Sequence, residues 1–237
     1  MERIGIIGGT GFKGWNEFEI EEEIDKHTPW GSPSSPLYKG ELGERTVFLL
    51  MRHGPDHTIP PHRINHRANI YAMQEEVEDI IGLCSAGALG SEIKVPSISI
   101  PDDYVNFWNP ITFYDEKIKH VTPGLSTKLR KDLIDSAEEL CEELKTEGAY
   151  VQTQGPRLET KAEIKILKDY GQFIGMTMAS EATLCKEVNL DYAGLLSVDN
   201  YANGIEGEEI DYDEIVDTAE ENWKKVKKIL ERFLKER

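Results

Sequence analysis

The sequence predicts an α/β protein with a mixed or largely parallel central sheet flanked by helices, on two observations. Short apolar runs rich in isoleucine and valine, too short for helices, indicate buried strands. Segments of helical periodicity lie between several of these runs, and such alternation is typical of α/β sheets. No repeat, low-complexity tract or convincing linker interrupts the pattern, so we expect one domain over residues 1–237.

The expected elements follow the chain in order. Strands are expected at residues 4–7, 47–51, 80–83, 95–100, 149–151, 173–176 and 192–198, and helices at 64–76, 126–144, 160–168, 180–188 and 211–235. Ligands of α/β sheets collect near the carboxyl ends of the strands. The polar residues that follow each apolar run are therefore the candidates for function.

Composition excludes several classes of partner. Lys and Arg number 27 against 44 Asp and Glu, and the resulting net charge of −17 disfavours nucleic acid and anionic membranes. No apolar run approaches the roughly 20 residues that cross a bilayer. The N-terminus carries no secretory signal, so we expect a cytoplasmic protein. The three cysteines have no CxxC spacing, which argues against a disulfide framework or a zinc knuckle.

A glycine-rich turn, Gly8-Gly9-Thr10-Gly11, follows the first expected strand. Its glycines let backbone N–H groups approach an anion, and the Thr10 hydroxyl adds a donor. The turn lacks the GxGxxG spacing and the lysine of a P-loop, so neither a dinucleotide nor a nucleoside triphosphate is implied. A purely structural turn is the alternative.

A basic segment, Arg52-His53-Gly54 with His57 just behind it, follows the second expected strand. The arginine fork suits bidentate contact with phosphate. One alternative is a surface arginine with solvent-facing histidines. Another is a metal site that also uses His62 and His66, but the Pro60-Pro61 break and the absence of HExxH give it no defined ligand geometry.

Small and polar residues also follow later strands. They are Ser85 after the third, Met176 and Thr177 after the sixth, and Asn200 after the seventh. Glu159 precedes a helix that Thr160-Lys161-Ala162-Glu163 opens as a capping box. Glu159 either favours the positive helix end or accepts hydrogen bonds from a ligand N–H. Neither a Gly-x-Ser-x-Gly elbow nor a catalytic acid pair is evident, so covalent catalysis is not indicated.

Taken together, eight ordered motifs resemble the methylthioadenosine phosphorylase branch of the purine nucleoside phosphorylases. They cover nearly the whole chain. The motifs are Gly8-Gly9-Thr10-Gly11, the segment 28–34, Arg52-His53-Gly54 through His57, 64–70, 85–89, 112–115, 154–157 and 175–181.

The resemblance implies a homotrimer, or a multiple of trimers, that uses inorganic phosphate as a co-substrate with no metal and no cofactor. It assigns phosphate to five residues and the sugar to His57 and Met176. The phosphate residues are Thr10, Arg52, His53, Ser85 and Thr177.

The expected base pocket departs from the adenine-specific pattern of that family. Adenine-type members carry Thr-Asp-Tyr-Asp where this chain has Asp199-Asn200-Tyr201-Ala202, and Ser where it has Glu159. A 6-oxopurine presents O6 as acceptor and N1–H as donor, which an amide and a carboxylate can satisfy. Asn200 and Glu159 are also the pair that 6-oxopurine phosphorylases use. We therefore expect phosphorolysis of methylthioinosine, inosine or guanosine, with Asn200, Glu159 and His57 as the catalytic group.

The pocket for the sugar and its 5′ substituent is expected from a looser set of residues. An apolar lining would suit a methylthio group, whereas His120 could bind a 5′-hydroxyl. A methylthioadenosine phosphorylase with re-oriented Glu159 and Asn200 is one alternative, and a non-catalytic nucleoside-binding protein is the other. The set comprises Leu158, Met176, His120, Tyr212, Ile215 and Val216.

Overall fold

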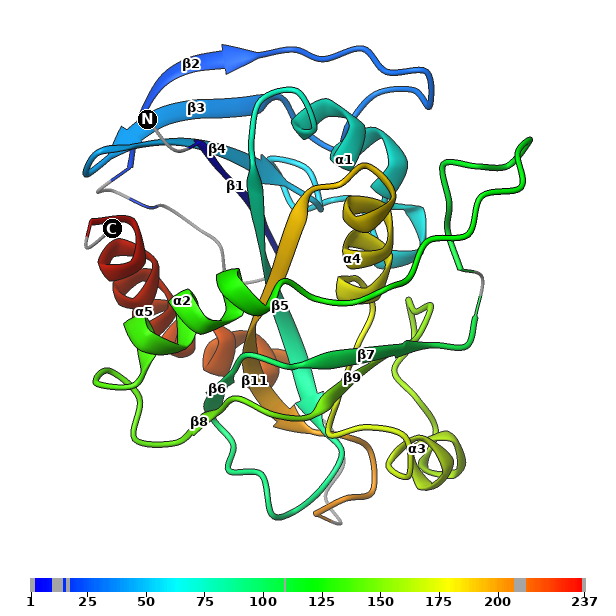
Figure 1. Ribbon diagram of the computed structural model, residues 1–237. Coiled ribbons are helices and arrows are strands. Elements are labelled where there is room, and N and C mark those ends of the chain that lie inside the picture. Colours follow the sequence, from blue (N-terminus) through cyan, green and yellow to red (C-terminus); the bar gives the residue numbers. More distant parts are fainter. Residues whose placement is uncertain (1–2, 10–14, 16–17, 109, 207–211, 236–237) are drawn as a thin grey trace.

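The computed structural model describes residues 3–9, 15, 18–108, 110–206 and 212–235, without the side chains of Tyr212 and Glu214. Strands and helices alternate along the described chain (Figure 1). The strands are β1 (Arg3–Gly8), β2 (Glu19–Ile24), β3 (Leu37–Leu42), β4 (Arg45–Met51), β5 (Asp79–Ala88), β6 (Ser97–Ser99), β7 (Asp103–Asn106), β8 (Leu144–Lys145), β9 (Ala149–Gln152), β10 (Phe173–Gly175) and β11 (Asp191–Tyr201). The helices are α1 (His66–Met73), α2 (Thr127–Ala137), α3 (Lys161–Leu167), α4 (Met178–Glu187) and α5 (Tyr212–Lys235), with a 3-10 turn at Pro61–Arg63.

The strands form one mixed sheet, which confirms the expected fold class. Its main path runs β2-β3-β4-β1-β5-β10-β9-β7, and β11 pairs with β5 beside it. β1 is parallel to both β4 and β5, and β11 is parallel to β5. β10 runs antiparallel to β5, as β3 does to β4. Parallel strands thus form the centre, and antiparallel pairs extend it.

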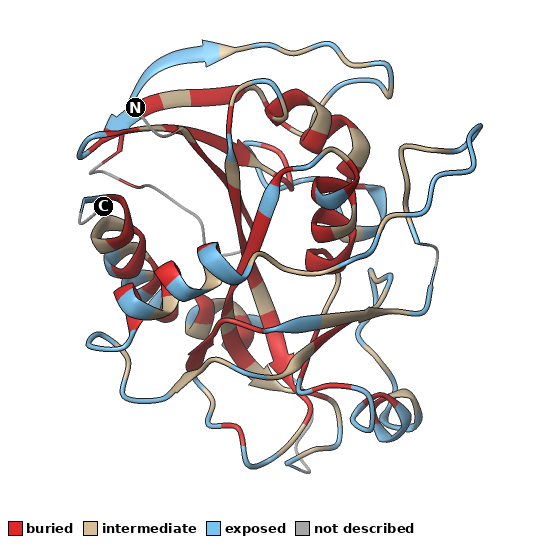
Figure 2. Ribbon diagram, in the orientation of Figure 1, coloured by how far each residue is buried: buried red, intermediate tan, exposed pale blue. Residues whose placement is uncertain are grey.

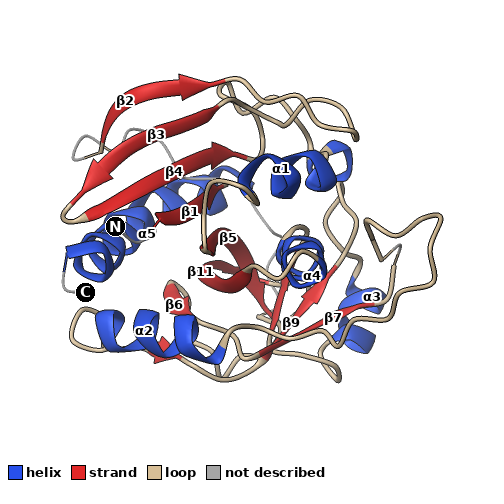
Figure 3. Cartoon of the chain, turned by 45° about the horizontal axis from the view of Figure 1, so that its top comes forward, coloured by secondary structure: helices blue, strands red, loops and turns tan. Residues whose placement is uncertain are grey.

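Helices cover both faces of the central strands (Figures 1 and 3). α1 and α4 pack on one face, where Ile70, Met73 and Leu184 belong to one buried cluster with strand residues. α2 and α5 pack on the other, where Leu133 and Phe233 belong to a second cluster. The sheet therefore has an apolar core on each side, as parallel strands buried on both faces require.

Helix boundaries follow capping side chains. Asn65 caps α1 and Ser126 caps α2, each accepting a backbone N–H through its side chain. Thr160 and Glu163 form the expected capping box at the start of α3. The helix expected at 126–144 is too long, because α2 ends at Ala137 and the chain then forms β8, which pairs with β6.

Besides β8, three described strands were not expected from the sequence. β2 reads EIEEEI and lies at one end of the main path with almost every side chain exposed (Figure 2). β2 is held in the sheet by backbone pairing with β3. Its place therefore does not require an apolar run, and the sequence shows none. β3 and β7 mix polar and apolar residues, so neither shows a continuous apolar run.

Two central strands, β5 and β11, are longer than expected. β5 extends to Ala88 and β11 to Tyr201, because the two pair in parallel along their whole length. Ser85 and Asn200 were expected to follow strands. Because both strands are longer, the two residues lie within them. Within the described chain, no helix is both long and apolar enough to span a bilayer.

Candidate active site

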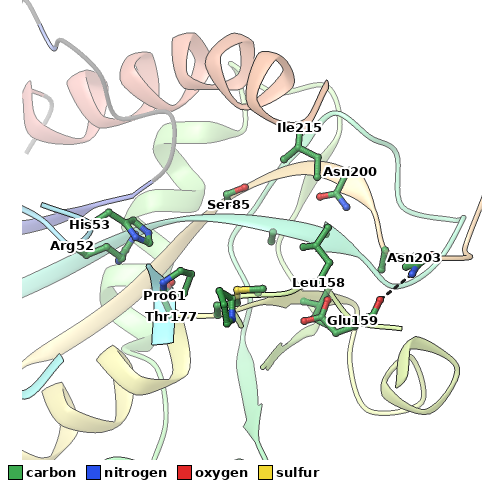
Figure 4. Close-up of a pocket in the computed structure, with 17 residues that line it drawn as sticks. Arg52, His53, Pro61, Ser85, Leu158, Glu159, Thr177, Asn200, Asn203 and Ile215 are labelled. Carbon is green, nitrogen blue, oxygen red and sulfur yellow. Dashed lines mark hydrogen bonds between the residues drawn. The ribbon is translucent and has the colours of Figure 1, made fainter. Parts of the chain in front are cut away.

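A cavity of about 210 Å3 opens beside β5 and collects most of the predicted site residues (Figure 4). Arg52 and His53 lie at one end of it, and Glu159 and Asn203 at the other. The predicted residues that line it are Arg52, His53, Ser85, Leu158, Glu159, Met176, Thr177, Asn200 and Ile215. Their assigned roles stay predictions, but the residues share one cavity.

Strand directions explain how distant segments meet here. Arg52 directly follows β4, which is linked to β5 through β1. β10 runs antiparallel to β5 with Phe173 opposite Ala88, so the chain after it returns toward Ser85 and delivers Thr177. α4 starts at the next residue, Met178. The positive end of that helix therefore faces the same end of the cavity as Arg52.

Arg52 is buried at 1% exposure, which contradicts the alternative of a surface arginine. Its Nε and Nη2 donate to Glu181 at 2.7 and 3.0 Å, and its Nη1 donates to the Leu83 carbonyl at 2.5 Å. Burial alone would lower the pKa of Arg52, but the Glu181 carboxylate outweighs it and the pKa is raised. The guanidinium is thus a permanent cation held in a fixed orientation.

His53 is held as a neutral acceptor. Its Nδ1 lies 2.8 Å from the Ile59 carbonyl, which can only accept, so Nδ1 carries the proton. Burial and the nearby Arg52 lower the pKa of His53 to about 4. Near neutral pH the remaining nitrogen, Nε2, presents a lone pair and can accept a hydrogen from a ligand hydroxyl.

Ser85 and Thr177 are also engaged. The Ser85 hydroxyl donates to Oδ2 of the buried Asp199 at 2.5 Å. Thr177 directs its hydroxyl to the Cys84 sulfur at 3.6 Å, and its backbone N–H donates to the Tyr150 hydroxyl at 3.2 Å. These side chains are fixed before any ligand arrives.

At the other end, Glu159 and Asn200 keep free capacity. Oε1 of Glu159 accepts the Thr153 hydroxyl at 2.5 Å, which leaves Oε2 for a ligand N–H. Asn200 uses one N–H on the Tyr201 carbonyl at 2.8 Å and retains its carbonyl oxygen and a second N–H. Asn203 donates to the backbone carbonyl of Glu159 at 3.0 Å, so the two loops are tied together.

Three predicted residues that the structure describes, His57, His120 and Val216, are not brought into this cavity. His57 is exposed with its ring 4.6 Å from that of His53, and Val216 lies on α5 outside the lining. His120 borders a separate cavity with Lys119 and Glu187. Thr10 and the side chain of Tyr212 lie outside the described residues.

Sequence reasoning gave no separate role to several residues that build the site. Glu181 holds Arg52, and Asp199 holds Ser85. Both are buried carboxylates, and acidic residues in otherwise apolar segments were the available signal. The remaining lining residues are Pro61, Ala86, Gly87, Pro156, Ile174, Gly175, Ala202 and Asn203.

The four histidines between positions 53 and 66 do not form one group, although the rings of His53 and His57 lie 4.6 Å apart. His53 and His66 are buried, whereas His57 and His62 are exposed. Throughout the described residues, no three His, Cys, Asp or Glu side chains are grouped as metal ligands.

Comparison with known proteins gives a consistent similarity. The model of the Phosphorylase superfamily matches residues 3–235. A probable 6-oxopurine nucleoside phosphorylase of Archaeoglobus fulgidus is 42% identical over 98% of this chain and 96% of its own. A probable S-methyl-5'-thioinosine phosphorylase of Thermodesulfovibrio yellowstonii is 38% identical over 93% of this chain and 85% of its own. The structure of methylthioadenosine phosphorylase from Schistosoma mansoni with adenine superposes with a TM-score of 0.87 at 25% identity, covering 99% of this chain and 91% of that one.

Proposed function

The chain belongs to the phosphorylase superfamily, as its motifs predict, and from this premise we propose that it phosphorolyses 6-oxopurine nucleosides. The products are the free purine and ribose 1-phosphate, or methylthioribose 1-phosphate. One observation carries the proposal: a carboxylate and an amide, Glu159 and Asn200, share a cavity with the cation Arg52. That arrangement offers hydrogen bonds for a 6-oxopurine at one end and for an anion at the other.

Phosphate binds at the end formed by Arg52, His53, Ser85 and Thr177, beside the first turn of α4. It attacks C1′ of the ribose while the bond to purine N9 breaks. The sugar passes through an oxocarbenium-like state, and the adjacent phosphate dianion stabilises that positive charge. Positioning of the two reactants supplies much of the remaining acceleration.

The purine leaves with the electron pair of the broken bond, so negative charge develops on its ring. The free N–H of Asn200 stabilises this charge at N7 and O6, and Oε2 of Glu159 accepts from N1–H. Thr153 supports this task because its hydroxyl fixes the other carboxylate oxygen. Adenine would leave the Glu159 carboxylate without a donor at N1, and a mismatch of that kind discriminates strongly.

We further propose that the enzyme works in the cytoplasm as a homotrimer or a multiple of trimers. His120 is exposed on the segment between β7 and α2, which stands out from the body of the chain (Figure 1). Ile118 beside it is 94% exposed. In this arrangement His120 reaches the 5′ position in the cavity of a neighbouring copy. Light scattering should report a trimer or its multiple, and a fully active monomer would contradict the arrangement.

A phosphorolysis panel tests the substrate class. Methylthioinosine, inosine, guanosine, methylthioadenosine and adenosine are incubated with and without phosphate, and purine release is followed by ultraviolet absorbance. We expect phosphate-dependent release that is fastest for the 6-oxopurines. A preference for methylthioadenosine would replace the proposal with an adenine-specific phosphorylase, and binding without release would indicate a non-catalytic protein.

A further inference from the structure

The pairing of β11 with β5 contains one irregularity, at Asp199. The strands pair residue by residue as far as Val198 opposite Ala86, but the next pair is Asn200 opposite Gly87. Asp199 is therefore the extra residue of a β-bulge. Bulges are known to re-aim side chains near active sites.

The bulge changes which face Asn200 occupies. Side chains of a regular strand alternate, so without the extra residue Asp199 would lie opposite Gly87 and Asn200 would point to the other face. With it, Asn200 lies on the face that Ser85 and Gly87 share. A methyl group on Gly87 would sit 3.4 Å from Nδ2 of Asn200, which shows that the amide lies against this glycine.

Three side chains from three elements hold Asp199 in place. Ser85 of β5 donates to Oδ2 at 2.5 Å, and Asn222 of α5 donates to Oδ1 at 3.1 Å. Ser197 of β11 donates to Oδ1 as well. Asp199 is 3% exposed and is not among the described residues that line the cavity. Burial raises its pKa, although the three donors oppose that shift.

The same contacts fix the direction of the Ser85 hydroxyl. A serine hydroxyl carries one hydrogen, and here it points at the Asp199 carboxylate. Only oxygen lone pairs of Ser85 then remain for the cavity. Ser85 and Nε2 of His53 are then both acceptors, so an anion beside them binds well only if it brings a hydrogen to one of the two, and hydrogen phosphate has one O–H whereas sulfate has none.

We infer that Asp199 is a positioning residue with two tasks: it anchors the bulge that presents Asn200 to the purine, and it turns Ser85 into an acceptor that selects a protonated oxyanion. The inference rests on the proposed function for its ligands. It reaches beyond that function because it links the two ends of the cavity through one residue that touches neither ligand.

The anion task is tested with Asp199→Asn, which keeps the size of the side chain and one acceptor oxygen. Asn222 Nδ2 can only donate to the Oδ1 position, so the amide oxygen should stay there and the amide nitrogen should donate to Ser85, whose hydrogen then turns toward the cavity. Affinities for phosphate and for sulfate are measured by calorimetry at one pH. We expect the preference for phosphate over sulfate to fall about tenfold, which is the effect of reversing one hydrogen bond so that Ser85 donates to the anion. A ratio within twofold of wild type would overturn this task.

The bulge task is tested with Asp199→Ala and, should that variant fold poorly, with Gly87→Ala, which leaves Asp199 intact and places a methyl group 3.1 Å from Ile174 and in contact with the Asn200 amide. Each should reduce the preference for hypoxanthine over adenine in the presence of phosphate several-fold, and Gly87→Ala should leave the anion ratio unchanged. Ser197→Ala removes one of the three donors to Asp199 and keeps the carboxylate, so it should shift the base preference in the same direction by a smaller factor than Asp199→Ala. An unchanged base preference in both folded variants would overturn this task.

The outcome separates the inference from the proposed function. If the wild-type chain binds phosphate but prefers adenine, the proposed substrate class fails, while the ratio of phosphate to sulfate still decides the role of Asp199. If the base preference holds and Asp199→Asn changes nothing, only the inference fails.

Discussion

The two ends of the cavity differ in how firmly their side chains are held. At the phosphate end Arg52 and Thr177 are 1% and 7% exposed and already bond to buried groups. At the base end Leu158 is 40% exposed and Glu159 lies on a loop, with one carboxylate oxygen uncommitted. The difference implies that the phosphate end is part of the buried core, whereas residues that set base specificity can be substituted without loss of folding stability.

The largest effect is expected for Arg52→Ala. The substitution leaves the carboxylate of Glu181 buried without its cation, and breaking a buried pair in this way costs about 3–5 kcal/mol. Chemical denaturation should show this loss, and any folded fraction should need far more phosphate. Arg157→Ala is the matched control and should cost far less, because Arg157 pairs with Glu163 at the surface, where solvent screens the charges. Equal losses in the two variants would contradict the comparison.

The phosphate end should also carry much of the pH dependence of stability, because buried His66 lies behind it with Nδ1 3.9 Å from Oε1 of Glu181, the partner of Arg52. Burial lowers the pKa of His66 from 6.5 to about 4, and within the described residues its Nδ1 has no hydrogen-bond partner. A depressed pKa gives stability that is full above pH 6.5 and is lost as the pH falls through about 4. His53 acts in the same direction.

Unfolding free energy measured from pH 7 to pH 4 should therefore fall, by about 3 kcal/mol for a shift of the size seen at His66. His66→Gln should flatten this slope. His62→Gln, at an exposed position, is the control and should keep the wild-type slope. An identical slope in both variants would show that His66 does not contribute to the pH dependence of stability.

The smallest change in stability, and the clearest in specificity, is expected at the base end. Asn200→Asp should lower the ratio of inosine to adenosine turnover by about tenfold to a hundredfold. The effect should appear mainly in kcat, because charge on the leaving purine develops in the transition state. Adding Glu159→Ser should move the preference further and non-additively, since both residues hold one ring. An altered phosphate KM or melting temperature would contradict the comparison between a firmly held phosphate end and a base end that tolerates substitution.

The sequence predicted the central strands of this fold and nine of the residues that line its cavity. Apolar runs marked β1, β4, β9 and β10 closely, because buried parallel strands carry continuous hydrophobic stretches. It underestimated β5, whose later half is small and polar and is specified by pairing with β11. It missed β2, in which backbone pairing at the sheet edge replaces any hydrophobic signal.

The site was predictable where local motifs carry it and not where tertiary contacts do. Arg52 and Ser85 were found from their place after apolar runs, and Glu159 and Asn200 from motif departures that change hydrogen-bond polarity. The buried partners Glu181 and Asp199 were not given roles, because each acts on a residue distant in sequence. The alternation of β11 alone would also have turned Asn200 away from the cavity, since a bulge leaves no pattern in the sequence.

The acidic strand β2 has a consequence for how copies of this chain meet. It ends the main path of the sheet, and its sequence EIEEEI places four carboxylates along that edge. An open edge strand offers unpaired backbone groups to any other strand, and charged side chains are a common protection against such growth. Two copies approaching edge to edge would bring these like charges together. The sheet is thereby closed to extension at β2, and contacts between copies are steered toward other surfaces.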